Sequence, residues 1–213
     1  MHWLLVVVGW FLLINQSIGC TPPSFSSLNV ERNFNLHRFL GIWYEIKWYT
    51  TVNIPPSDVW TDYAQSFQLK HRFGQSLLVY GKARLQTAQE CFSFGPWLVR
   101  ANNGAKMIVE KEDLNSNTRL NRPYYVLKTD YKNYALTYTC ISTNYNLNQP
   151  CTERNLHLFS RKTSLSWRYL GPLYNYIKNV LCIDQTQLTT IVFHPRTCFR
   201  SHYRNFGSSE RHG

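Results

Sequence analysis

Apolar and aromatic residues recur in short runs along most of the chain, and within many runs they alternate with polar residues. The runs are rich in Val, Ile, Thr and aromatic residues, which favour strands, and Pro, Gly and Asn residues separate them. The pattern predicts eight strands, at residues 42–49, 59–69, 76–85, 90–99, 106–112, 124–131, 134–141 and 155–162. Short strands at this spacing are typical of an antiparallel sandwich or barrel.

The spacing of the apolar residues changes near the C-terminus. Between Leu170 and Leu181 the apolar residues recur at helical spacing and form one face of a predicted helix, with Pro172 near its first turn. A short ninth strand is expected at residues 188–193. If the eight strands close into a barrel, its interior is just wide enough for one small ligand.

The first residues read as a targeting segment. The apolar run from Trp3 to Ile14 is too short to cross a membrane, and the small residues Ser17 and Gly19 precede Cys20. We expect residues 1–19 to be a secretory signal peptide, although no Lys or Arg precedes the run, and a lipid anchor on Cys20 is the alternative. No later segment has the apolar length of a transmembrane segment, so we expect a secreted, extracellular protein.

All six cysteines follow the expected signal peptide, at Cys20, Cys91, Cys140, Cys151, Cys182 and Cys198. An even number in an oxidising compartment predicts three disulfides, but the spacing does not choose among the pairings. No CxxC pair is present, so we expect no metal site. We also expect no cofactor.

The formal net charge is +11 and belongs entirely to the part after residue 19. Its C-terminal end carries Arg196, Arg200, Arg204 and Arg211 against Glu210, which suits weak contact with anionic glycans or a membrane surface. A solubilising surface is the simpler interpretation. Nucleic acid is not an expected partner, since the sequence has no recognition helix or zinc finger.

Three stretches carry a family resemblance. They are "NFNLHRFLGIWYEI" with Gly41-x-Trp43, "VLKTDYKNYALTYTC" with Thr129-Asp130-Tyr131, and "LHLFSRK" with Arg161. In this order they resemble the three motifs of the lipocalin family, and "TDYKNYALTYTC" is most similar to the apolipoprotein D-like branch with its invertebrate relatives. The resemblance covers roughly residues 20–198. It implies an all-β fold, an eight-stranded antiparallel up-and-down barrel with one C-terminal α-helix packed outside, followed by a basic, flexible tail at 199–213.

The resemblance also implies structural roles for these residues. Gly41 turns the chain tightly into the first strand, and Trp43 closes one end of the barrel. Arg161 stacks on the Trp43 indole and donates to nearby carbonyl groups. Asp130 accepts hydrogen bonds in a tight turn between two strands. No catalytic residue is implied.

The disulfide pairing follows from the same resemblance. Cys20–Cys140 is the family pattern. The second strand lacks the cysteine that the apolipoprotein D-like branch carries there, so Cys198 is expected to pair with Cys91. Cys151–Cys182 then remains as an additional bond.

Strand alternation, phased on Trp43 and Arg161, predicts the side chains that face the interior. The candidate ligand-binding residues are Tyr63, Gln65, Phe67, Leu77, Val79, Trp97, Met107, Val109, Lys111, Tyr124, Val126, Lys128, Thr137, His157 and Phe159. Thr139 and Asn155 share this phase. Apolar walls with a few polar groups suit a fatty acid, retinoid, bilin or steroid-like ligand, and Lys111, Lys128 and His157 suit a carboxylate or phenolate on it.

Several of these residues also have an ordinary structural interpretation. Lys111 and Lys128 can point to water at the rim, and Trp97 and Tyr124 can simply pack the barrel. Glu45 and Lys47 share the phase of Trp43, so strict alternation places both charges inside, where an unpaired charge is costly. Three alternatives stay open: the two charges pair with neighbouring groups, lie near the widening mouth of the barrel, or mark a bend in this strand.

Three functions are compatible with these patterns. The first is an extracellular binding or transport protein that carries or sequesters a small hydrophobic ligand, without enzymatic activity. The second is a lipocalin-fold isomerase that uses a pocket cysteine, which needs a free thiol. The third is a basic protein that binds anionic glycans or lipids through its surface.

Overall fold

The computed structural model describes residues 19–55, 59–72, 74–85, 90–101, 103–113 and 118–199, and within 111–120 it describes no side chains. The predicted signal peptide apart from Gly19, and the predicted tail apart from Phe199, lie outside the described residues. No described helix is long and apolar enough to span a membrane.

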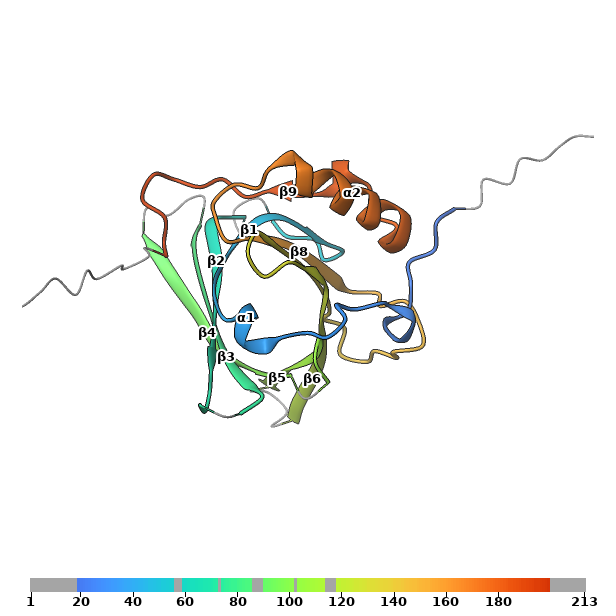
Figure 1. The fold of residues 1–213 in the computed structure, drawn as a ribbon. Coiled ribbons are helices and arrows are strands. Elements are labelled where there is room, and N and C mark those ends of the chain that lie inside the picture. The colour runs from blue at the N-terminus through green and yellow to red at the C-terminus, as the bar shows by residue number, and fades with distance from the viewer. Residues whose placement is uncertain are drawn as a thin grey trace, which may run out of the picture.

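Eight antiparallel strands close into a barrel (Figure 1). Each strand pairs with the next along the chain, and β1 pairs with both β2 and β8, which completes the circle. The strands are β1 (Gly41–Thr50), β2 (Trp60–Leu69), β3 (Ser76–Leu85), β4 (Cys91–Arg100), β5 (Lys106–Asp113), β6 (Thr118–Thr129), β7 (Tyr134–Cys140) and β8 (Arg154–Ser160). The predicted all-β, eight-stranded up-and-down barrel is therefore confirmed.

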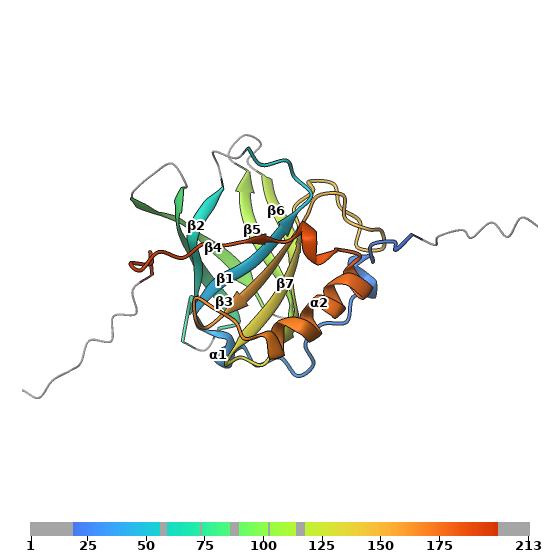
Figure 2. The same cartoon turned by 90° about the horizontal axis from the view of Figure 1, so that it is seen from above.

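One helix packs on the outside of the barrel, as predicted (Figures 1 and 2). Helix α2 (Trp167–Leu181) buries Leu173, Ile177 and Leu181 in a core that includes outward-facing residues of β6, β7 and β8. It begins three residues before Leu170, so Pro172 lies inside the helix and not near its first turn. The short helices are η1 (Phe25–Ser27), α1 (Leu36–Phe39) and η3 (Gln185–Gln187), and α1 lies across one end of the barrel.

Irregularities in strand pairing change which side chains face inward. The pairing register shifts between Glu45 and Lys47 in β1, and between Val126 and Lys128 in β6. A bulge inserts an extra residue into a strand, so the alternation reverses beyond it. The prediction that Lys128 faces the interior was wrong for this reason. For Lys47, strict alternation fails at the register shift, which agrees with the alternative that these charges mark a bend in the strand.

The C-terminal segment 189–199, which we call the strap, completes the wall between β1 and β2. The pairing of β1 with β2 ends at Tyr44 and Ala64. Beyond that point β9 (Thr189–Thr190), shorter than the predicted ninth strand, pairs with β1, and the Asp62 N–H of β2 donates to the Val192 carbonyl at 2.9 Å. The strap therefore lies in the space that β1 and β2 leave between them.

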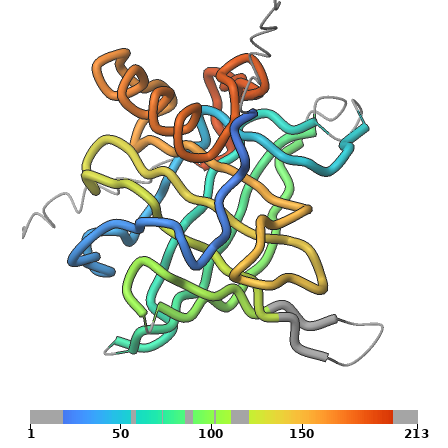
Figure 3. The backbone as a smooth tube through the Cα atoms, turned by 90° about the vertical axis from the view of Figure 1, so that its right-hand side faces the viewer, coloured from blue at the N-terminus to red at the C-terminus, as the bar shows by residue number. Residues whose placement is uncertain are grey.

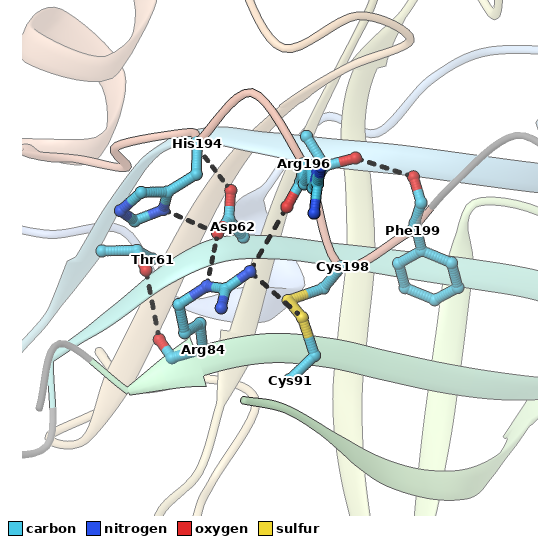
Figure 4. The surroundings of a disulfide bond; sticks show 9 residues. Thr61, Asp62, Arg84, Cys91, His194, Arg196, Cys198 and Phe199 are labelled. Atoms are coloured by element: carbon cyan, nitrogen blue, oxygen red, sulfur yellow. Dashed lines mark hydrogen bonds and ion pairs between the residues drawn. A yellow bond between two sulfur atoms is a disulfide. The ribbon is translucent and has the colours of Figure 1, made fainter. Parts of the chain in front are cut away.

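A buried carboxylate holds the strap in place (Figure 4). The Asp62 side chain is fully buried and accepts hydrogen bonds from Arg84 Nε at 3.0 Å, His194 N at 2.7 Å and His194 Nδ1 at 2.8 Å. The Cys91–Cys198 disulfide, predicted from the resemblance, ties the end of the strap to β4. The last described residues are thus anchored to the barrel wall.

The other two disulfides differ from the prediction. Cys140 pairs with Cys151, and Cys20 pairs with Cys182, in place of Cys20–Cys140 and Cys151–Cys182. Cys140 ends β7 and Cys151 precedes the adjacent β8, so their Cα atoms lie 5.8 Å apart. The N-terminal segment runs along the outside of the barrel (Figure 3), and Cys20 lies 5.4 Å, Cα to Cα, from Cys182 at the end of α2.

Candidate functional site

Trp43 and Arg161 close one end of the barrel, as the resemblance implied. The Trp43 ring is fully buried, its Nε1 donates to the Phe39 carbonyl at 2.8 Å, and the guanidinium carbon of Arg161 lies 3.6 Å from the ring centroid. Arg161 also donates to the backbone carbonyls of Ile42 (2.9 Å), Arg38 (3.0 Å), Tyr131 (3.1 Å) and Phe39 (3.4 Å). Burial lowers the pKa of Arg161 to about 10, so the side chain stays cationic at neutral pH.

Gly41 is required at the start of β1. Its φ of +94° is unfavourable for other residues, and an added Cβ would lie 3.3 Å from a guanidinium nitrogen of Arg161. The tight turn into β1 and the placement of the Arg161 guanidinium at the closed end therefore both depend on Gly41.

The Asp130 turn at this end is built by hydrogen bonds to one carboxylate. Asp130 accepts from the backbone N–H groups of Lys132, Asn133 and Tyr134 at 3.1, 2.7 and 3.0 Å, and from the Asn133 side-chain amide at 2.6 Å. Burial alone would raise the pKa of Asp130, but these hydrogen bonds outweigh it and hold the pKa below its ordinary value. Beside it Thr129 donates to the Tyr134 carbonyl at 2.7 Å, and Tyr131 accepts from the Asn35 N–H at 2.9 Å.

An apolar layer fills the barrel above the closed end. Seven of the predicted ligand-binding residues are fully or almost fully buried and do not border the cavity described next: Phe67, Leu77, Val79, Met107, Val126, Thr137 and Phe159. All but Thr137 belong to the core that surrounds Trp43. The inward phase predicted for them was right, but the structure places them in the packed interior.

A cavity of about 330 Å³ lies between this layer and the mouth, by which we mean the end of the barrel opposite Trp43 and Arg161. Six predicted residues border it: Tyr63, Gln65, Trp97, Val109, Tyr124 and His157. The remaining lining consists of Trp60, Phe94, Arg122, Thr139, Ile141 and Asn155, of which only Thr139 and Asn155 had been placed in the inward phase. Its walls are mostly aromatic and aliphatic, with a few polar groups, as in small-molecule sites.

Three of the four lining residues that the sequence did not indicate have identifiable causes. Trp60 precedes a register shift in β2, and both Phe94 and Trp97 border the cavity because the pairing of β3 with β4 shifts between Val79 and Gly81. Arg122 lies in β6, which begins six residues earlier than predicted. Extending the alternation from Tyr124 back by one step would have found it.

The two lysines predicted in the site do not contribute described contacts there. Lys128 is exposed on the outer face, with its Nζ 5.3 Å from the Tyr176 ring centroid on α2. The side chain of Lys111 lies outside the described residues. Among described residues, Arg122 is therefore the cation that borders the cavity.

Glu45 is the buried charge inside the barrel. Its side chain is fully buried, Oε2 accepts from Trp60 Nε1 at 3.0 Å, and Oε1 contacts His157 Nδ1. Trp60 and His157 border the cavity, so the carboxylate lies behind both of them. Lys47, beyond the bulge, instead contacts the Thr190 hydroxyl of the strap. One of the two charges predicted inside is there, and it is paired.

Hydrogen bonds connect three cavity-lining residues, from Tyr124 on β6 through Gln65 to Tyr63 on β2. Tyr124 donates its hydroxyl proton to Gln65 Oε1 at 3.3 Å, and Gln65 Nε2 donates to the Tyr63 hydroxyl oxygen at 2.7 Å. Burial raises the pKa of both tyrosines well above its ordinary value, and the charge of Glu45 raises it further. Both phenols stay protonated at physiological pH. Within this set of three residues the Tyr63 hydroxyl only accepts, so its own proton is not donated to Gln65 or Tyr124.

The arrangement suits non-covalent binding. The cavity residues offer aromatic surface and hydrogen-bonding groups, and all six cysteines are in disulfides. The described residues contain no group of three or more His, Cys, Asp or Glu side chains that would hold a metal ion.

Comparison with known proteins gives likeness in structure only. No family model and no curated protein matches the sequence. Lobster apocrustacyanin A1 is 20% identical with a TM-score of 0.54, over 74% of this chain and 79% of that chain. For apocrustacyanin C1 the identity is 21% and the TM-score 0.54, over 75% of this chain and 80% of that chain. Apocrustacyanin C2 is 20% identical with a TM-score of 0.58, over 82% of this chain and 91% of that chain. The barrel, its outer helix and its closed end thus give this chain the lipocalin fold.

Proposed function

We propose that the protein is an extracellular binding or transport protein that carries or sequesters one small hydrophobic molecule inside its barrel. The ligand classes that suit the lining are fatty acids, retinoids, bilins and steroid-like molecules. Binding is non-covalent, and the protein has no enzymatic role. Within the lipocalin fold, the motifs around Trp43, Asp130 and Arg161 support membership of the lipocalin family and its apolipoprotein D-like branch.

The aromatic cavity is the observation that carries this proposal. Its volume of about 330 Å³ falls at the lower end of the usual range for small-molecule sites. Burying an apolar ligand there contributes roughly 25 cal/mol for each Å² removed from water. Trp60, Tyr63, Phe94, Trp97 and Tyr124 supply most of that surface.

Secretion is supported by two features. The apolar segment 1–19 has the composition of a signal peptide, and three disulfides are stable in an oxidising compartment. A carrier outside the cell would shield its ligand from water during transport. The barrel domain 20–198 is the part that performs this role.

The two alternatives have less support. An isomerase of this fold would need a pocket thiol, and no cysteine borders the cavity or is free. A surface role for the basic C-terminal end rests largely on Arg200, Arg204 and Arg211, which lie outside the described residues. We therefore favour the binding role.

Tryptophan quenching tests the proposal. Residues 20–213 contain five tryptophans, and Trp167 is 67% exposed on α2, so a Trp167→Phe protein reports mainly on the barrel. Titration with retinoic acid, a conjugated polyene fatty acid and biliverdin should give saturable quenching with one site at micromolar concentration for at least one of them. Steroids are tested by displacement of the bound quencher.

A second variant locates the signal. Trp97→Phe in the same background removes a cavity tryptophan, and the quenching amplitude should fall. Absence of saturable quenching and displacement by every compound would contradict the proposal.

A further inference from the structure

The polar groups of the cavity are separated along the barrel axis. Helix α1, whose Phe39 carbonyl accepts a hydrogen bond from Trp43, lies at one end of the barrel (Figure 2), and the mouth is the opposite end. β6 runs from the mouth to the Asp130 turn, so Arg122 lies nearer the mouth than Tyr124, and Val126 lies deeper still. Thr139 and Asn155 are register partners near the mouth ends of β7 and β8.

Buried polar atoms near the mouth have no partner among the described residues. They are Arg122 Nε, Thr139 Oγ1 and Asn155 Oδ1, and all three residues border the cavity. A buried donor without an acceptor is unfavourable, and a cationic donor gains most from an anionic acceptor. The Arg122 guanidinium is therefore a ready partner for an acidic group, while Thr139 and Asn155 can bind water or a hydroxyl group beside it.

The inner part of the cavity has the opposite character. The Glu45 carboxylate lies behind Trp60 and His157, fully buried. This carboxylate is hydrogen-bonded to the cavity-lining Trp60, so its charge acts on the inner part of the cavity, and it adds to burial in raising the pKa of Tyr63 and Tyr124. A second anion placed there would meet the same potential, whereas the neutral hydroxyl of Tyr63 accommodates apolar atoms or an uncharged oxygen.

We propose that the ligand is a monoanionic amphiphile, bound with its acidic group on Arg122 near the mouth and its apolar body among Tyr63, Trp97 and Tyr124. This inference rests on the proposed function, because it orients the ligand in the same cavity. Among hydrophobic molecules of suitable size it selects carboxylic acids over their alcohols and amines. The acidic group stays close to solvent, and the apolar part is removed from water.

Pairs of ligands that differ only in the terminal group test the orientation. Retinoic acid and retinol are one pair, and a conjugated polyene fatty acid and its alcohol are another. A charge-assisted hydrogen bond predicts that wild-type protein binds each acid at least about tenfold more tightly than its alcohol. Arg122→Gln should reduce that ratio to within about threefold, by weakening the acid and leaving the alcohol nearly unchanged.

Two control variants sharpen the experiment. Lys128→Gln removes a cation from the outer face of the same strand and should leave the acid-to-alcohol ratio of wild type. Glu45→Gln should also keep the preference for the acid, because in this orientation the acidic group lies away from Glu45. Each ratio compares two ligands on one protein, so a change in stability does not imitate the effect.

The outcomes separate this inference from the proposed function. If acids and alcohols bind wild type equally well, or if the preference survives Arg122→Gln, the inference is overturned while ligand binding stands. A preference for the acid that rose strongly in Glu45→Gln and survived Arg122→Gln would place the acidic group at the inner end and would also overturn it. If no hydrophobic compound binds at all, the proposed function itself fails.

Discussion

The imidazole of His157 faces the carboxylate of Glu45 inside the barrel, with Nδ1 against Oε1, although 112 residues separate them in the chain. Trp60 Nε1 donates to the other carboxylate oxygen. A fully buried charge is unfavourable unless it is paired and hydrogen-bonded, and here both oxygens have partners. The contact joins β1, β2 and β8 behind the cavity wall.

Removing the Glu45 carboxylate should destabilise the barrel. We expect Glu45→Ala to lower the free energy of unfolding by about 3–5 kcal/mol, because it breaks a buried pair and leaves the Trp60 donor unsatisfied. Glu45→Gln should cost less, since its amide oxygen can still accept from Trp60. Urea denaturation followed by circular dichroism measures both values. The exposed control Glu153→Gln should stay within about 0.5 kcal/mol of wild type, and a Glu45→Ala protein that matched this control would contradict the role assigned to the pair.

Arg161 should be sensitive even to a change that keeps its charge. Arg161→Lys retains the cation but loses the planar stacking on Trp43 and most of the hydrogen bonds to four carbonyl groups. We expect a loss of about 2–3 kcal/mol in unfolding free energy. Thermal and urea unfolding check this value against the neighbouring exposed control Lys162→Ala. Equal stability of the two variants would show that the closed end does not depend on the guanidinium.

Asp130 should give a pH dependence of known sign. The hydrogen bonds to its carboxylate outweigh burial and hold the pKa of Asp130 in the folded protein below its ordinary value, so the ionised carboxylate stabilises the fold above the ordinary pKa. This contribution is lost as the pH falls through the folded pKa. The difference in unfolding free energy between wild type and Asp130→Asn should be constant from about pH 5 to pH 8 and should shrink below about pH 4. Denaturation at a series of pH values measures it, and a difference that grew on acidification would have the wrong sign.

The disulfides should differ in their contribution to stability. Cys91–Cys198 closes a loop with a sequence separation of 107, and Cys140–Cys151 one of only 11. Chain entropy predicts that replacing both cysteines by serine costs about 5 kcal/mol for the longer loop and about 3 kcal/mol for the shorter. Peptide mapping without reduction checks the pairing first, and a Cys20–Cys140 peptide would contradict this structure. The order of the two unfolding free energies then checks the loop argument.

Much of the fold was predictable because barrel strands carry a local pattern. Alternation and turn residues predicted every one of the eight strands, and the helical spacing after Leu170 predicted the outer helix. The roles of Trp43, Asp130 and Arg161 were also predicted, because the resemblance supplied them. These features depend on residues close together in the chain or on a motif in fixed order.

The site was predicted less completely because it depends on features that alternation does not contain. Bulges moved Lys47 and Lys128 to the outside, and the early start of β6 brought in Arg122. Alternation predicts which side chains face inward but not how far along the barrel axis they lie. Residues of the packed apolar layer, such as Phe67 and Met107, were therefore assigned to the cavity. Cys140 pairs with Cys151 because the ends of two adjacent strands bring them close together. The family pattern on which the prediction rested pairs other positions and does not contain this distance.

The most direct test of the claim that the cavity binds the ligand is to place a larger side chain in the cavity. Val109 borders the cavity, whereas its neighbour Ile108 is 40% exposed on the outside of the same strand. Equilibrium dialysis of the tightest-binding ligand against Val109→Trp and Ile108→Trp compares the two faces, with circular dichroism to show that both proteins are folded. The account predicts one site per wild-type chain, unchanged by Ile108→Trp and weakened at least about tenfold by Val109→Trp, because the added ring occupies the ligand's space. Undiminished binding by a folded Val109→Trp protein would contradict it.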